Sequence, residues 1–122
     1  MSFEHSLFEH SLLATPKAVP DLRHRLREHS YDVRLCATEL ITNVIDHVGD
    51  GTPVTIRVLP TAPGHTRIEV TDPEPHKLPI LQQATADAES GRGLALLTAL
   101  ARRWGVEWAA GRKTVWCEIS DS

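Results

Sequence analysis

Glu39 and Asn43 are the residues whose types and spacing most clearly suggest chemistry. Four positions separate them, so in a helix their side chains project side by side, with Asp46 and His47 next to them. A carboxylate can accept a proton from a water or hydroxyl, and a carboxamide oxygen is a hard ligand for a magnesium ion that bridges phosphates. The pair therefore suits phosphoryl transfer, and the alternative is an ordinary solvated pair on a helix surface.

The helix that would carry this pair is expected from about Tyr31 to Val48. Its apolar residues fall within one broad arc at about 100° per residue, which is typical of a helix packed on a core. The arc consists of Val33, Ala37, Leu40, Ile41, Val44, Ile45 and Val48. Gly49-Asp50-Gly51 is expected to end the helix, because these residues accept left-handed backbone conformations.

Gly91-Arg92-Gly93-Leu94 is a second candidate, at the start of a helix expected over Leu94 to Arg103. Two glycines two positions apart let the backbone approach an anion, and a helix N-terminus offers free amides and the positive end of the dipole. The stretch predicts either a phosphate cradle or a tight turn that needs positive φ. The preceding twenty or so residues after Asp72 have little periodicity, and long loops of this kind are often lids or binding loops.

The remaining elements predict a small α+β domain. Leu7 to Leu13 is expected to form a first strand, and Pro16 to about Ser30 an amphipathic helix whose arginines form a solvated face or a partner surface. Two hairpins follow: Val54 to Val58 with Arg67 to Thr71, and Trp104 to Ala109 with Thr114 to Ile119 across the turn Ala110-Gly111-Arg112-Lys113. This order predicts a two-layer sandwich, a mostly antiparallel sheet covered on one face by helices.

Length and composition predict one domain spanning residues 1–122, because 122 residues at 41% hydrophobic content suffice for a single core. The net charge of −3 gives no general attraction to nucleic acid or to an anionic membrane. No apolar run approaches a membrane span and the N-terminus lacks signal-peptide features, so a cytoplasmic location is expected. Cys36 and Cys117 are expected to be reduced packing residues.

From about Leu12 to Ile119 the chain resembles the GHKL (histidine-kinase-like) ATPase superfamily, and within it the small stand-alone bacterial anti-sigma-factor serine kinases and their ATP-binding regulatory relatives. Glu39 to His47 is similar to the family's N-box. The resemblance implies that Glu39 is the catalytic base, that Asn43 holds Mg²⁺, and that His47 lies near the phosphates of ATP.

The resemblance extends to the nucleotide-binding boxes. It implies that Asp72 binds the adenine amino group, that Thr114 joins it, and that Gly91-Arg92-Gly93-Leu94 borders an ATP lid of approximately residues 73–93. One departure is that Pro73-Glu74-Pro75 replaces the glycines that normally follow this aspartate. Prolines fix φ and remove amide donors, and Glu74 adds negative charge, so affinity for ATP is expected to be reduced.

Three functions follow from the resemblance. The first is an ATP-dependent serine/threonine protein kinase that binds a sigma factor and phosphorylates its anti-anti-sigma antagonist in transcription regulation. The second is a non-catalytic binding module that sequesters such a partner with weak or no nucleotide binding. The third, the ATPase half of a sensor histidine kinase, is disfavoured because the chain has no room for a dimerisation and phosphoacceptor helix. A homodimer is compatible with the resemblance.

Overall fold

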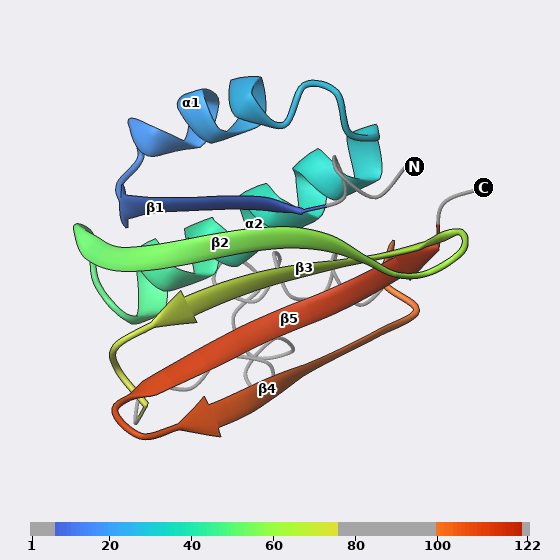
Figure 1. Cartoon of the computed structure of the whole chain (residues 1–122). Helices are drawn as coiled ribbons and strands as arrows, with labels where there is room; N and C mark the ends of the chain where they lie inside the picture. Colours follow the sequence, from blue (N-terminus) through green and yellow to red (C-terminus); the bar gives the residue numbers. More distant parts are fainter. Residues whose placement is uncertain (1–6, 76–99, 121–122) are drawn as a thin grey trace, which may run out of the picture.

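The computed structural model describes residues 7–75 and 100–120. Within these residues an antiparallel sheet has the strand order β1-β2-β3-β5-β4, and two helices cover one of its faces (Figure 1). The elements are β1 (Phe8–Ala14), α1 (Ala18–Arg25), α2 (Tyr31–His47), β2 (Thr52–Ala62), β3 (His65–Asp72), β4 (Arg103–Ala109) and β5 (Arg112–Ser120). The predicted two-layer α+β architecture is confirmed. In the described part of the chain, no helix has the length and apolar character needed to cross a membrane.

The core forms between α2 and the sheet, because the strands alternate aliphatic and polar residues. The inward residues of the central strands, Val54, Ile56, Val58, Ile68 and Val70, are all buried. The apolar arc of α2 packs against them through Val33, Cys36, Ala37, Leu40, Ile41 and Val44. Each fully buried aliphatic side chain contributes roughly 1.5–3 kcal/mol, so this contact fixes α2 on the sheet.

The ends of α2 are set by a cap and by two glycines. Ser30 accepts a hydrogen bond from the Val33 amide through its hydroxyl at 3.2 Å, which satisfies one of the free amides of the first turn. After His47 the chain reverses through Gly49 and Gly51, whose φ values are 151° and 93°. This short link places the C-terminal end of α2 at the edge of the sheet where β2 begins and β3 ends (Figure 1).

The predicted helix from Leu94 to Arg103 falls largely outside the described residues, but the structure corrects its end. Arg103 begins β4, and Arg102 and Arg103 donate to the Glu118 carboxylate at 2.9 and 2.8 Å instead of lying in the last turn of a helix. The Thr61 hydroxyl and the two guanidinium groups together lower the pKa of Glu118 to about 2. The arginines therefore compensate a buried carboxylate, not a helix dipole.

Cys36 of α2 and Cys117 of β5 meet in the core as free thiols, in agreement with their predicted role as reduced packing residues. A hydrogen bond between the two thiols lowers the pKa of Cys36 and raises that of Cys117. The contact ties α2 to β5, on the opposite side of β3 from the link between α2 and β2.

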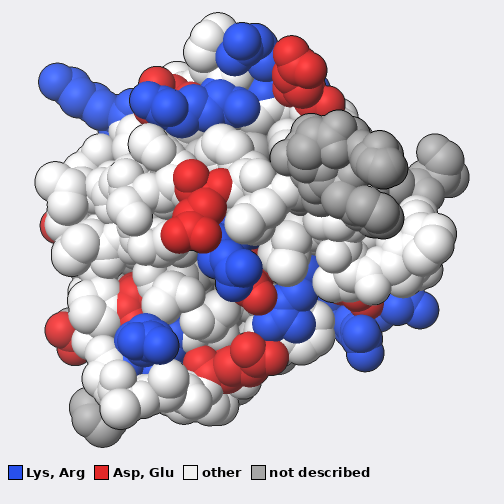
Figure 2. Space-filling view, viewed as in Figure 1, with Lys and Arg blue, Asp and Glu red and all other residues white. Residues whose placement is uncertain are grey.

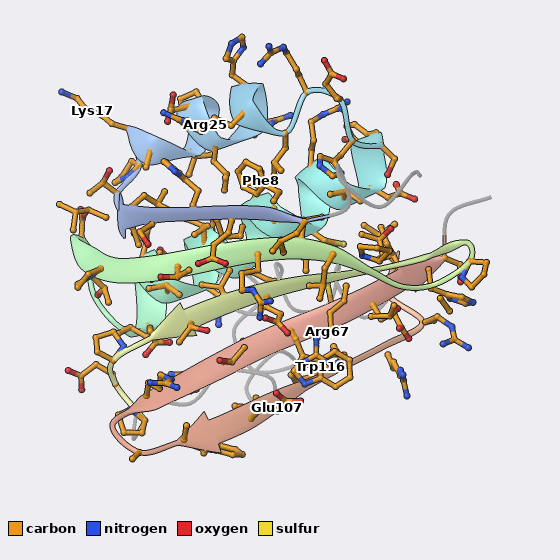
Figure 3. All side chains as sticks on the ribbon, in the orientation of Figure 1. Phe8, Lys17, Arg25, Arg67, Glu107 and Trp116 are labelled. Carbon is orange, nitrogen blue, oxygen red and sulfur yellow. The ribbon has the colours of Figure 1, made fainter. Side chains whose placement is uncertain are left out.

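The opposite face of the sheet is polar, and acidic and basic side chains alternate across it (Figure 2). Arg67 lies at its centre and donates to Glu69 at 2.8 Å and to Glu107 at 3.1 Å. The Arg67 guanidinium also lies 4.3 Å from the ring centroid of Trp116, so these side chains form a cluster on the surface (Figure 3). Gly105 lies directly beside the ring, where an added Cβ would come within 3.0 Å of Trp116.

Candidate nucleotide site

Glu39 and Asn43 lie one turn apart on α2, and both side chains are half-buried. The buried residues Leu40 and Val44 anchor this part of the helix, so the polar pair is held at the margin of the core. Burial, and secondarily the negative charge of Asp46, raises the pKa of Glu39. A raised pKa brings a carboxylate closer to neutral pH, where a general base takes up protons most effectively.

His47 is the last residue of α2, one turn beyond Asn43, and is half-buried. The C-terminal end of α2 lies near the end of β3 (Figure 1), so the last turn of α2, from Asn43 to His47, is at the same end of the domain as Asp72. The fold therefore brings the α2 motif and the β3 aspartate to one end of the sheet, although the whole of β2 lies between them in the chain.

Asp72, the last residue of β3, faces the helices and is 1% exposed. Its Oδ1 accepts a hydrogen bond from the Glu74 amide at 2.8 Å, in a turn that the aspartate side chain stabilises. Its Oδ2 is buried and accepts no hydrogen bond from any described residue. The carboxylate is thus oriented by one oxygen and has acceptor capacity on the other.

Lys113 is the residue that the sequence analysis missed. It was expected in the hairpin turn, but it belongs to β5, pairs with Asp72 in the strand register, and is 1% exposed. Its Nζ lies 3.4 Å from Asp72 Oδ2 and donates to the Glu74 carbonyl at 3.2 Å. The signal in the sequence was the inward alternation of β5, which extends from Ile119, Cys117 and Val115 back to residue 113.

Thr114 does not lie beside Asp72. Successive strand residues point to opposite faces, so Thr114 is on the polar face of the sheet. Its hydroxyl lies 2.7 Å from that of Thr71, which is its cross-strand neighbour. Lys113 therefore replaces Thr114 as the β5 residue in contact with Asp72.

The turn after Asp72 is built without glycines. Pro73 and Glu74 are exposed, so the Glu74 carboxylate is directed to solvent while its amide and carbonyl bind Asp72 and Lys113. The Pro75 carbonyl accepts a hydrogen bond from the indole of Trp108 at 3.0 Å. Gly91, Arg92, Gly93 and Leu94, and most of the predicted lid, lie outside the described residues.

The site thus combines a helix bearing a carboxylate and a carboxamide with an antiparallel sheet whose third strand ends in a buried aspartate. The sequence model of the histidine kinase-like ATPase domain family matches residues 12–119. The chain belongs to this family, which confirms the resemblance to the GHKL superfamily.

Two known proteins are similar to the chain. An uncharacterized protein of Streptomyces coelicolor is 55% identical over 82 residues, which cover 66% of this chain and 78% of that protein. The crystal structure of the RsbU and RsbW domains of Rv1364c from Mycobacterium tuberculosis superimposes with a TM-score of 0.65 at 19% identity. That match covers 93% of this chain but 32% of the solved chain, and it establishes a shared fold.

Proposed function

We infer that this chain is an ATP-binding anti-sigma regulatory protein with serine/threonine kinase activity toward an anti-anti-sigma antagonist. The observation that carries this proposal is the position of half-buried Glu39 on α2, one helical turn from Asn43, in a chain of the histidine kinase-like ATPase family. A base in that position can remove the proton from a substrate hydroxyl as phosphoryl transfer begins.

The residues present fit an adenine nucleotide with Mg²⁺. Buried Asp72 has one oxygen, Oδ2, that accepts no hydrogen bond from the described residues, and a carboxylate oxygen with this capacity suits an exocyclic amino group. The half-buried carboxamide of Asn43 offers a hard oxygen for Mg²⁺, and His47 lies one turn further toward the same end of the sheet. ATP, when bound with its metal, supplies the phosphoryl group that the reaction transfers. The phosphate cradle at Gly91 to Leu94 stays a prediction.

The proposed partners are a sigma factor and its antagonist, as the resemblance to anti-sigma kinases implies. The fold that the chain shares with the RsbW-containing structure supports this assignment at the level of architecture. On α1, Arg25 pairs with Asp21 at 2.9 Å and both side chains are largely exposed. Because Arg25 is already paired with Asp21, the arginine would offer a partner less free positive charge than an unpaired arginine does.

A second candidate is a binding module without catalysis, and the turn after Asp72 favours it. Pro73 and Pro75 donate no amide hydrogen bonds, so this edge of the site offers fewer donors to a nucleotide than a glycine turn does. In this alternative Glu39 and Asn43 do not take part in catalysis, and the domain holds its partner by surface contacts alone.

Calorimetric titration with Mg-ATP, followed by a phosphotransfer assay, separates the two candidates. The chain is used to capture its partners, and phosphate on their serines and threonines is measured by mass spectrometry after addition of Mg-ATP. The kinase proposal expects ATP binding and phosphorylation, with Glu39→Gln retaining binding and losing about 10²- to 10⁴-fold in rate. Capture of a partner without ATP binding supports the binding module, and equal rates for Glu39→Gln and wild type refute the base.

A further inference from the structure

β1 forms one edge of the sheet, because the strand order begins with it and it pairs with β2 alone (Figure 1). Phe8 to Ala14 run opposite Val58 to Thr52 without a shift in register, so the strand is regular over its whole length. Along its other side, no described residue makes a backbone hydrogen bond to β1. A regular edge of this kind presents N–H and C=O groups that can pair with a further strand.

Edge strands usually carry features that prevent such pairing, and β1 lacks the common ones, which are lysine, proline and a bulge. The stretch from Leu7 to Ala14 contains no lysine, arginine or proline, and its one carboxylate, Glu9, lies 3.6 Å from Arg57 of β2. The opposite edge strand, β4, carries Arg103 and Glu107, both of which form ion pairs. Of the two edges, β1 is therefore the one suited to strand addition.

The apolar side chains near both ends of β1 divide between the two faces of the sheet. Leu7, which directly precedes the strand, is 52% exposed, and Leu13 is 57% exposed. Alternate residues share a face, so both leucines lie on the outer face of the sheet. Phe8 and Leu12 lie on the inner face, where they are only partly buried against the core. A second strand along this edge would cover apolar surface on both faces.

The sequence of this stretch is symmetric in character about His10. Going outward from His10, each side has a polar residue, then an apolar residue, then a leucine: Glu9, Phe8 and Leu7 on one side, and Ser11, Leu12 and Leu13 on the other. We propose that β1 binds the β1 strand of a second copy of this chain, antiparallel and centred on His10. The sheet then continues from one copy into the other.

In this register each apolar side chain meets another apolar side chain. Leu7 lies opposite Leu13 of the second copy on the outer face, and Phe8 lies opposite Leu12 of the second copy on the inner face. Such directly opposed pairs are the units that stabilise a sheet. The arrangement has a two-fold axis, so each of the two pairs occurs twice.

The polar residues favour the same centre. With the axis at His10, Glu9 lies opposite the hydroxyl group of Ser11, so the two carboxylates of the dimer do not face each other. An axis at Glu9 would place these carboxylates directly opposite, which is destabilising, and an axis at Ser11 would place Glu9 against Leu13. A shift of one residue would pair the inner face of one copy with the outer face of the other. Of these registers, the one centred on His10 alone covers both exposed leucines with apolar side chains.

The first test measures the oligomeric state of the full chain without nucleotide, by sedimentation velocity at concentrations up to about 100 μM. A dimer is expected. The double variant Leu7→Lys with Leu13→Lys places like charges opposite each other at both ends of the strand pair, and should weaken the dimer about tenfold to a hundredfold. Because both positions are exposed, the variant should keep its fold.

Two further variants serve as controls for this test. Leu7→Lys with Leu13→Glu places opposite charges at the same positions, and should bring the dissociation constant back to within about tenfold of wild type. Tyr31→Lys adds a lysine at a position of α2 that is 59% exposed, and should leave the dimer unchanged.

The second test reads the register by disulfide formation. Directly opposed residues of antiparallel strands have Cα atoms about 4.5–5.5 Å apart, which a disulfide can span. Leu7→Cys chains mixed with Leu13→Cys chains should therefore become linked in the presence of oxidised glutathione. Either chain alone should not, because its two equivalent positions lie about 20 Å apart in the dimer. The native Cys36 and Cys117 are buried, and wild type measures their background.

The outcomes decide the inference without reference to the proposed function. A wild type that stays monomeric, or a double-lysine variant that dimerises as tightly as wild type, overturns the proposal. Links within one kind of chain that form as readily as links between the two kinds also overturn it. If the double-lysine variant does not fold, the disulfide test still decides. Because no measurement uses nucleotide, failure here leaves the proposed ATP binding and kinase activity to their own assays.

Discussion

Breaking the ion pair between Asp72 and Lys113 is predicted to destabilise the fold more than replacing both residues. The charges are 3.4 Å apart and the two side chains are 0% and 2% exposed. At an effective dielectric constant of about 20, their attraction is about 5 kcal/mol at this distance. The desolvation of both ions offsets much of this energy, so the net value of the pair is small while the cost of leaving one charge alone is large.

Lys113→Met is expected to lower the free energy of unfolding by about 3–5 kcal/mol, because it removes the ion-pair partner of the buried Asp72 carboxylate. Asp72→Asn is expected to cost about 2–4 kcal/mol, because the amide oxygen can still accept from the Glu74 amide but the Lys113 ammonium loses its anionic partner. The double variant is expected to cost at least about 2 kcal/mol less than the sum of the single variants.

Urea unfolding at pH 7 without nucleotide, followed by tryptophan fluorescence, measures these energies. Trp108 reports on the region directly, because its indole donates to the Pro75 carbonyl at 3.0 Å. Arg112→Met, at an exposed position of the same strand, is expected to change stability by less than about 0.5 kcal/mol and serves as the control. A coupling energy below about 0.5 kcal/mol between positions 72 and 113 would refute the reasoning.

Three further predictions concern single groups. Burial and the charge of Asp46 raise the pKa of Glu39, so ionisation of this carboxyl group destabilises the fold as the pH rises. Glu39→Gln should therefore raise the melting temperature at pH 7.5. A gain of equal size at pH 4 would show that ionisation of Glu39 is not the cause. The pKa of Glu118 is lowered from 4.5 to about 2, so its stabilisation is present above pH 4.5 and is lost toward pH 2. Because Arg102 and Arg103 are 47% and 63% exposed, Glu118→Gln should lower the free energy of unfolding by only about 1 kcal/mol at pH 7. Chemical denaturation should show that this difference from wild type disappears near pH 2. Gly105→Ala places a Cβ 3.0 Å from the Trp116 ring and should lower the free energy of unfolding by about 1–3 kcal/mol. The displaced ring should change the near-ultraviolet circular dichroism signal. An unchanged signal would show that the ring can accommodate the methyl group.

The sheet and α2 were predictable because their patterns are periodic and each element is locally consistent. The alternation in β2 and β3 and the apolar arc of α2 located these elements to within a few residues, with the strands longer than predicted. The spacing of Glu39 and Asn43 was also sufficient to place them on one side of the helix. Local periodicity determines which residues of one element share a face, and this was enough to identify the buried side of α2, β2 and β3.

The part that could not be predicted depends on contacts between distant segments. Lys113 follows Gly111 and Arg112, so its charge and position favour a turn, and its burial follows only from the pairing of β5 with Asp72 on β3. A shift of one residue in strand register decides whether Lys113 or Thr114 meets the aspartate. Arg102 and Arg103 were assigned to a helix for the same reason, since their partner Glu118 lies on another strand.

The tight link between α2 and β2 has a consequence for how the site responds to ligands. Gly49 and Gly51 allow α2 to pass directly into the strand beside β3, and the thiol contact of Cys36 with Cys117 ties the same helix to β5. We therefore expect the separation between the α2 pair and Asp72 to be set during folding and to stay the same when a ligand binds. Amide hydrogens of Leu40 to Val44 should exchange only through global unfolding, and binding should change that rate solely through overall stability.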